Sequence, residues 1–587
     1  MAAIPLHAGP FRLVLLPEDG SLRYLMAGEH EVLRGIAAPV RDQAWATIRP
    51  QISEVNVAQR EKEFTVTFVA RCRQNEIDFL WRGRIAGTAE GTITYDFDGE
   101  ARSDFLRNRI GFCVLHPADL QGASCVVEHV DGRIENGAFP QRILTGAPFA
   151  NIRALTHHVA PGVAAEVRLE GDTFEMEDQR NWTDASFKTY CTPLGLPRPV
   201  RIAKGTRIQQ RITVRLVGSP PAVPAGFCAP WESPPEVEVT VGDAPIGPLP
   251  ALGVSLPSAA VPPAVIDALR PLGLSHLRVD LWLADPAHVA KLKAAARVAE
   301  EMNVALELAV FVDDSSPDQL TRLRETLASF APAPRIARWL VFHETTDATP
   351  PSAVAAMRQV FTGTPFAAPI GGGATDNFTE LNYHPSVAAV ADFTAHACNP
   401  QVHAFDEASI VETLAMQGIT VANARALSAG KPSVVSPVTF TRRWRLNDAG
   451  APGELPAGLL PFQTDPRHAF PFNAAWTLGS LASLASAGAH SLTYFETHGE
   501  NGLVDAHGAP LPVYYTFAAL NGWQDATVLP ASSSHPLHIA TLALVRGDRR
   551  ILRLANLRPQ PQVVRITTTS GSHRLELPAH SIRPIPL

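Results

Sequence analysis

The sequence has no cluster of Lys and Arg, no long apolar run and no grouped cysteines, and each absence excludes a class of protein. The chain has 587 residues and a formal net charge of -7 at pH 7. Without a basic cluster it lacks the positive surface that binds phosphates, so we expect no nucleic-acid partner. No apolar run approaches the roughly 18 residues that span a bilayer, so we expect no membrane partner. The N-terminal residues lack a basic region before an apolar core, so no signal peptide is expected.

The cysteines and histidines limit the cofactor chemistry. The six cysteines are Cys72, Cys113, Cys125, Cys191, Cys228 and Cys398. They are scattered without metal-type or disulfide-type spacing, which predicts reduced thiols in a cytoplasmic protein. The histidines include no HxH or HExxH pair. We therefore expect no metal site and no cofactor.

The composition and the N-terminal half predict a multidomain protein. A chain of this length exceeds a single hydrophobic core, and 46% apolar with 18% charged residues is typical of a globular protein. Residues 1–217 contain short segments in which apolar and polar residues alternate, which predicts an antiparallel β-sandwich. Residues 218–250 are dense in proline and are interpreted as a linker.

Residues 251–524 predict a (β/α)8 barrel, because apolar strand-like runs alternate there with helical patterns. Seven of the eight expected strands are 252–256, 276–283, 304–312, 337–342, 392–397, 433–440 and 491–495, and the fifth begins near 365–370 and runs into the glycine-rich residues that follow. An open doubly wound sheet is the alternative, but no GxGxxG turn follows the first strand. Residues 525–587 return to strand patterns. We expect them to form a small β module that packs against the barrel or completes the sandwich, so the fold class is α/β combined with all-β.

Polar side chains follow the apolar runs, and in a parallel barrel the carboxyl ends of all strands meet at one mouth. Strand four ends on Glu344 within VFHETT, and strand eight ends on Glu496 within YFETH. We expect His396, near the end of strand six, to join these two glutamates as a catalytic candidate. The expected substrate-binding residues at the mouth are Arg278, Asp280, His343, Asn382, Asn399, His403 and Tyr494. Such a set suits general acid–base chemistry on a polyhydroxylated substrate.

Several candidates also have a purely structural interpretation. Glu344 is alternatively a surface residue paired with a nearby Arg. Arg278 and Asp280 lie two apart on one strand and are alternatively an ion pair inside the barrel. Glu380 and Asp406 are alternatively helix-capping groups.

One segment of the predicted sandwich is unusually polar. Residues 175–190, EMEDQRNWTDASFKTY, concentrate hydrogen-bonding and stacking groups in one expected loop. We expect this loop to border the barrel mouth, with Trp182 or Lys188 near the substrate, since loops on rigid scaffolds often carry binding groups. The alternative is a solvated loop held by its own salt bridges.

The order of domains resembles the clan A glycoside hydrolases, in which glutamates at the ends of strands four and seven do the chemistry. Glu344 matches the strand-four position, in a His-Glu pair where that clan usually has Asn-Glu. Strand seven departs from the pattern, because SVVSPVTFTRR contains no carboxylate. The close carboxylate pair of a retaining glycosidase is therefore not present there.

A closer resemblance runs along the whole chain. The segments RNRIGFCVLHP, EMEDQRNWTDASFKTY, NFTELNYHP, NPQVHAFDEASIVETL and FNAAWTLGSLASLASAGAHSLTYFETHG are similar to the D-apionate lactonase family of bacterial apiose catabolism. The resemblance implies hydrolysis of D-apionolactone to D-apionate, with a small sugar lactone as the partner. Lactone opening needs a base, oxyanion donors and an acid, and we expect Glu344 and Glu496 to be the acid–base pair. A glycoside hydrolase and a catalytically silent carbohydrate-binding protein are the alternatives.

The first prediction concerns metal dependence. Because the histidine and cysteine spacings match no ligand motif, hydrolysis should proceed without a bound metal. Dialysis against EDTA should leave the rate of acid release from a sugar lactone unchanged in a pH-stat. Loss of activity that one divalent ion restores would contradict this.

Overall fold

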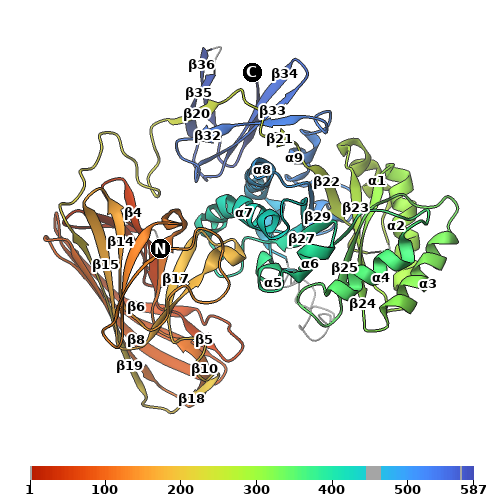
Figure 1. Cartoon of the computed structure of the whole chain (residues 1–587). Helices are drawn as coiled ribbons and strands as arrows, with labels where there is room; N and C mark the ends of the chain where they lie inside the picture. Colours follow the sequence, from red (N-terminus) through yellow and green to blue (C-terminus); the bar gives the residue numbers. More distant parts are fainter. Residues whose placement is uncertain (1–2, 259, 444–463, 569–570) are drawn as a thin grey trace. The chain divides into compact units, whose positions relative to one another are not determined.

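The computed structural model describes residues 3–258, 260–443, 464–568 and 571–587. The chain divides into two compact units, one comprising Met1–Arg180 with Ala185–Ser233 and the other Asn181–Asp184 with Pro234–Leu587 (Figure 1). Four residues of the polar 175–190 segment therefore belong to the second unit. Part of the predicted barrel range, residues 444–463, lies outside the described residues.

The first unit is built from antiparallel strands, as the alternating pattern predicts. In β7 every second residue is buried along most of the strand, so one face lies on the core and the other faces outward. One hydrogen-bonded path joins fourteen strands in the order β1-β2-β3-β4-β11-β17-β16-β14-β15-β19-β9-β8-β7-β6. The strands enclose a single hydrophobic cluster, which gives the sandwich-like arrangement.

The strands of this path are β1 (Ile4–Ala8), β2 (Phe11–Leu16), β3 (Ser21–Ala27), β4 (His30–Ala37), β6 (Pro50–Gln59), β7 (Phe64–Gln74), β8 (Ile77–Gly87), β9 (Thr92–Ala101), β11 (Cys113–Pro117), β14 (Ile152–Ala160), β15 (Val163–Glu170), β16 (Phe174–Asp178), β17 (Ser186–Cys191) and β19 (Arg207–Val217). Beside it, β12 (Ser124–His129) pairs with β13 (Ile134–Ala138) and β14. A separate three-stranded sheet contains β5 (Val40–Asp42), β10 (Phe105–Ile110) and β18 (Val200–Ile202).

The second unit contains the eight-stranded parallel barrel predicted from the sequence, and the structure shows that this barrel is closed. Its strands are β22 (Ala251–Ser255), β23 (His276–Trp282), β24 (Ala305–Val312), β25 (Ile336–His343), β26 (Ile370–Gly373), β27 (Phe393–Cys398), β28 (Ser433–Val438) and β29 (Ser491–His498). The barrel closes because β22 pairs in parallel with both β23 and β29. The short β30 (Gly502–Val504) pairs with β29 beyond the closure.

Strand five, β26, begins at Ile370, the last residue of the range in which its start was predicted, and runs into the glycines as expected. Pro365 and Pro369 lack the amide hydrogens that a strand ladder needs. The glycines after them are required by close packing: a Cβ built on Gly373 would lie 1.8 Å from the carbonyl oxygen of Ala395 on β27. The glycine run is therefore a strand that approaches its neighbour closely.

Helices cover the outside of the barrel. They are α1 (Pro263–Leu269), α2 (His288–Met302), α3 (Ser316–Ala328), α4 (Pro351–Phe361), α5 (Phe378–Tyr383), α6 (Ser386–Val390), α7 (Glu407–Leu427), α8 (Pro471–Ser486) and α9 (Tyr514–Ala518). Glu380 and Asp406 cap helices, as their structural interpretation proposed: Glu380 completes a capping box with Asn377, and Asp406 accepts the amide hydrogen of Ser409. In the described part of the chain, helices long and apolar enough to cross a membrane are absent.

The C-terminal strands form two small sheets that lie against the barrel, with α8 packed on β33 (Figure 1). Their strands are β31 (Thr527–Leu529), β32 (Ala531–Ser533), β33 (Ile539–Arg546), β34 (Arg549–Asn556), β35 (Gln562–Thr568), β36 (Gly571–Leu577) and β37 (Ile582–Pro586). The predicted linker contributes β20 (Val237–Val241) and β21 (Gly247–Pro248) to these sheets, and β20 pairs in parallel with β35. The end of the linker is thus part of the folded module.

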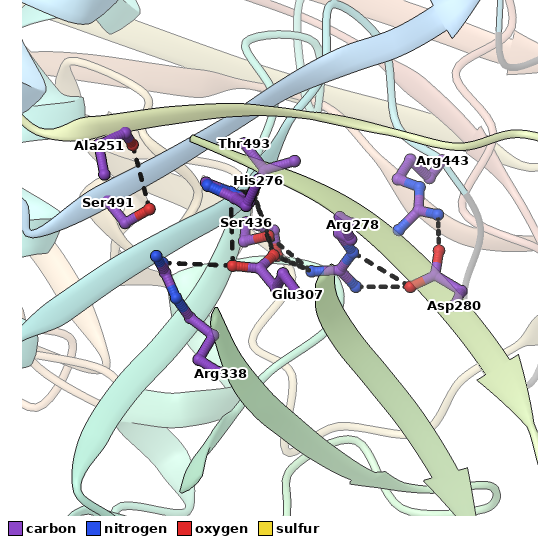
Figure 2. Close-up of polar contacts among 10 residues, drawn as sticks. All are labelled: Ala251, His276, Arg278, Asp280, Glu307, Arg338, Ser436, Arg443, Ser491 and Thr493. Atoms are coloured by element: carbon purple, nitrogen blue, oxygen red, sulfur yellow. Dashed lines mark hydrogen bonds and ion pairs between the residues drawn. The ribbon is translucent and has the colours of Figure 1, made fainter. Parts of the chain in front are cut away.

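The interior of the barrel contains charges as well as apolar side chains. Glu307 of β24 is fully buried, and its carboxylate lies 3.3 Å from Nη1 of Arg338 and 3.6 Å from Nε2 of His276 (Figure 2). It also accepts hydrogen bonds from the hydroxyls of Ser436 and Thr493. Burial opposes the charge of Glu307, but the electrostatic interactions with His276, Arg338 and Arg278 outweigh burial and lower the pKa of its carboxyl. Glu307 is therefore an ionised centre that neighbouring groups compensate.

This buried charge leads to a stability prediction. Replacing Glu307 with Ala leaves the buried Arg338 without its carboxylate, and breaking a buried pair in this way costs about 3–5 kcal/mol. Glu307→Ala should lower the midpoint of thermal and urea unfolding. The matched control is Glu300→Ala on the exposed surface of α2, where we expect a change within about 0.5 kcal/mol. Equal midpoints for the two variants would contradict the role of Glu307.

Candidate active site

A cavity of about 330 Å³ opens where four neighbouring barrel strands end. Its walls come from β22, β23, β28 and β29 and the loops that follow them, together with one side chain of α2. The lining residues are Ser255, Leu256, Pro257, Asp280, Trp282, Lys291, Thr439, Phe440, Thr441, Arg443, His468, Phe495, Glu496 and Asn501. Its position matches the face on which barrel enzymes place their chemistry, and its volume is in the range of small-molecule sites.

A β-bulge in β29 directs Glu496 into this cavity. Val254 pairs with Tyr494 but the next residue, Ser255, pairs with Glu496, so Phe495 is the extra residue. Phe495 has a φ of 49°, in the left-handed region that a bulky residue rarely adopts. Such bulges change the direction of a side chain next to functional sites. As a result Phe495 and Glu496 both line the cavity, although they are adjacent in sequence.

The surroundings of Glu496 favour proton exchange. Burial raises the pKa of its carboxyl, and the nearby carboxylate of Asp280 raises it further. Arg443 and Lys291 oppose this shift through their positive charges without cancelling it. A buried carboxyl with an elevated pKa is suited to take a proton from water and return it.

Asp280 has the opposite character, because two guanidinium groups hold it. Burial would raise its pKa, but the charges of Arg278 and Arg443 outweigh burial and hold the pKa of Asp280 well below its usual range. Nη2 of Arg278 lies 2.8 Å from one carboxylate oxygen, and Arg443 forms an ion pair with the other (Figure 2). Asp280 is therefore a permanent carboxylate in the cavity wall. Arg278 is fully buried. The two residues thus form the ion pair inside the barrel that was their structural interpretation in the sequence.

Glu344 directly follows β25, one of three neighbouring strands that carry stacked aromatic side chains near their ends. Trp282 stacks on Phe311 with 4.2 Å between ring centroids, and Phe311 contacts Phe342 at 5.4 Å. Glu344 follows two residues after Phe342 and is half-buried. Burial raises the pKa of its carboxyl and Asp313 raises it further, while the amide of Ala284 and the charge of His343 oppose the shift. Glu344 is not one of the described residues that line the cavity.

Three other candidates point away from the cavity. His343 lies at the mouth, with Nε2 3.4 Å from the exposed Asp314. His396 is completely buried and its Nε2 lies 3.1 Å from the hydroxyl of Thr420 on α7. Tyr494 is also buried, and its hydroxyl lies 2.8 Å from that of Ser480 on α8. Because alternate residues of a strand face opposite sides, His396 and Tyr494 face the outer helices.

The segment Asn181–Asp184 contacts three of the predicted substrate-binding residues, Asn382, Asn399 and His403, which follow strands five and six. Asn382 donates a hydrogen bond of 3.0 Å to the side-chain oxygen of Asn181. Asn399 accepts one from the hydroxyl of Thr183 through its backbone carbonyl. These contacts tie the segment to the barrel, within the second unit.

The same segment holds an imidazole in place. Nδ1 of His403 lies 2.6 Å from the carboxylate of Asp184, and its ring meets Trp182 edge to face. Trp182 thus contacts a barrel residue. Lys188 belongs to the first unit and forms an ion pair of 2.7 Å with Glu177.

Among the polar residues of the cavity that the sequence did not point to are Ser255 and Lys291. Ser255 is the last residue of β22, so the strand-end rule that selected Glu496 also applies to it. Lys291 belongs to α2 at a spacing that places it with the buried Ala295, Val298 and Met302 on one helix face. A lysine on an apolar helix face is the signal that would have found it. Within the described residues, no group of three or more His, Cys, Asp or Glu side chains is placed to hold a metal ion.

Comparisons with known proteins give consistent matches along the chain. The family model for the D-apionate lactonase N-terminal domain matches residues 2–219, and that for the D-apionate lactonase TIM barrel domain matches residues 251–525. A D-apionate lactonase from Brucella anthropi is 34% identical, covering 96% of this chain and 94% of that protein.

The similar solved structures are more distant. A GH30 endoxylanase from Clostridium papyrosolvens has a TM-score of 0.42 at 13% identity and covers 59% of this chain and 98% of its own. A family 51 alpha-L-arabinofuranosidase from Bifidobacterium longum has a TM-score of 0.40 at 13% identity, covering 60% of this chain and 95% of its own. Scores this low support no inference about function.

Proposed function

This chain belongs to the D-apionate lactonase family, and from that premise we propose that it hydrolyses D-apionolactone to D-apionate in apiose catabolism. The observation that carries the proposal for the site is the small cavity at the barrel mouth with the buried carboxyl of Glu496 in its wall. Its volume suits a small ring rather than a polysaccharide chain. The enzyme is therefore a carboxylic ester hydrolase acting on a lactone.

In the proposed mechanism Glu496 moves the proton. Its carboxylate takes a proton from a water molecule, and the water oxygen attacks the carbonyl carbon of the lactone. The tetrahedral intermediate then collapses, the bond to the ring oxygen breaks, and that oxygen takes the proton back from Glu496. The products are a free hydroxyl and a carboxylic acid, which loses its proton to solvent. Atoms and charge balance without an oxidant or a cofactor.

The roles of the other candidates follow from their positions. Asp280 keeps a fixed negative charge beside Glu496, and this charge favours the protonated form that appears after water is activated. Glu344, outside the lining, is not needed for these steps. His396 and Tyr494 face the outer helices, and we do not include them in the mechanism. All six cysteines are free thiols, which supports placing the enzyme in a reducing compartment such as the cytoplasm.

Removing the carboxyl of Glu496 tests the mechanism directly. Glu496→Gln keeps the shape of the side chain and removes proton transfer, so kcat on D-apionolactone should fall by about 10²–10⁴-fold with a smaller change in KM. Glu325→Gln, on the exposed surface of α3, is the matched control and should keep wild-type activity. Glu344→Gln distinguishes a mechanism that uses the carboxyl of Glu496 alone from one that uses both glutamates. A loss in Glu344→Gln as large as in Glu496→Gln would replace this mechanism with the acid–base pair expected from the sequence.

The pH dependence of kcat gives an independent test. Glu496 must be deprotonated to accept a proton, and burial raises its pKa above the ordinary value of 4.5. Activity should therefore be present at higher pH and be lost as the pH falls through this raised pKa. The residual activity of Glu496→Gln should lack that acidic limb. A wild-type profile that stays flat down to pH 4.5 would contradict the assignment.

A further inference from the structure

The hydroxyl of Ser255 has no structural role that the fold explains. Ser255 is 6% exposed, and its Oγ is buried without a hydrogen-bond partner among the described residues. A buried hydroxyl without a hydrogen-bond partner lowers the stability of the protein, so its presence in a cavity wall indicates a function there. The side chain lines the cavity, and Ser255 is the register partner of Glu496 on the neighbouring strand.

Lys291 is the cation of the cavity that no carboxylate holds directly. Its side chain reaches the cavity from α2, and no described residue accepts a hydrogen bond from its Nζ or lies within ion-pair distance. Arg443, by contrast, forms an ion pair with Asp280. Burial lowers the pKa of the Lys291 ammonium group, while the negative charges of Asp280 and Glu496 act on it from beyond ion-pair distance and raise this pKa against the effect of burial. Its ammonium group is thus available to a ligand in the cavity.

We propose that Ser255 Oγ and Lys291 Nζ form the oxyanion site for lactone opening, an inference that rests on the proposed function. When water attacks, the electron pair of the carbonyl π bond moves to the carbonyl oxygen, which becomes negative. The hydroxyl of Ser255 donates a hydrogen bond to this oxygen, and the ammonium of Lys291 contributes a second donor and a full positive charge. When the intermediate collapses, the pair returns and the carboxylic acid forms.

The positions of Glu496, Ser255 and Lys291 around one cavity suit attack by water on a carbonyl carbon. Glu496 adjoins Ser255 through the pairing of β22 with β29, so the base and the oxyanion donor border the same space. A carbonyl group held by Ser255 and Lys291 therefore has its carbon near water that Glu496 activates. The same two donors then lie beside the carboxylate of the product. The site thus selects a substrate that has a carbonyl oxygen and yields an anion.

The test compares Ser255→Ala and Lys291→Met with two neighbouring controls, Ser258→Ala and Lys293→Met, which are exposed. Each oxyanion variant should lower kcat by about 10²–10³-fold with little change in KM, because the donor acts on charge that develops after binding. Ser255→Ala should keep or slightly raise Tm, since its hydroxyl makes no hydrogen bond within the described protein. Lys291→Arg should recover part of the lost kcat. The controls should retain wild-type kcat and Tm.

The outcomes separate this inference from the proposed function. If the wild type opens D-apionolactone and both Ser255→Ala and Lys291→Met keep kcat within about twofold, the oxyanion assignment is overturned and the function stands. A lower Tm for Ser255→Ala with an unchanged kcat would likewise show a structural role instead. If the wild type opens no lactone, the proposed function fails and this inference fails with it.

Discussion

The buried carboxylate of Glu307 is the contact on which the barrel interior depends. Desolvated cations such as Arg338 are stable inside a protein only when opposite charge and hydrogen bonds compensate them. Glu307 compensates the charge of Arg338 and lies 3.6 Å from Nε2 of His276, and the hydroxyls of Ser436 and Thr493 donate hydrogen bonds to one of its carboxylate oxygens (Figure 2). Strands β23, β24, β25, β28 and β29 are thereby tied together by polar contacts as well as by their ladders.

The same set of charges extends to the cavity and determines its electrostatics. Arg278 lies between Ser436, whose oxygens it contacts, and Asp280, which it holds ionised. Asp280 in turn pairs with Arg443 and raises the pKa of Glu496. An interior that supports the fold thus also prepares the proton-transfer group. The dependence is physical, because a permanent charge beside a buried carboxyl changes how readily that carboxyl ionises.

Much of the fold could be predicted from the sequence because apolar runs and helical patterns alternate regularly. The positions of β25 and β29 were found in this way, and with them Glu344 and Glu496, although β29 continues to His498, beyond its predicted end at 495. The sequence could not show that the side chains of His396 and Tyr494 face the outer helices rather than the cavity. Strands in a parallel barrel are apolar on both faces, so a run such as that of β27 contains no alternation to show which residues face inward.

The sequence by itself determined the order of the elements, the strand ends on which polar groups stand, and the family to which the chain belongs. Only the tertiary structure decided which of those polar groups share a cavity. Glu496 enters it because a bulge at Phe495 changes the register against β22, and Lys291 enters it because α2 packs with that side chain toward the mouth. Both depend on contacts between residues far apart in the chain, which local patterns do not encode.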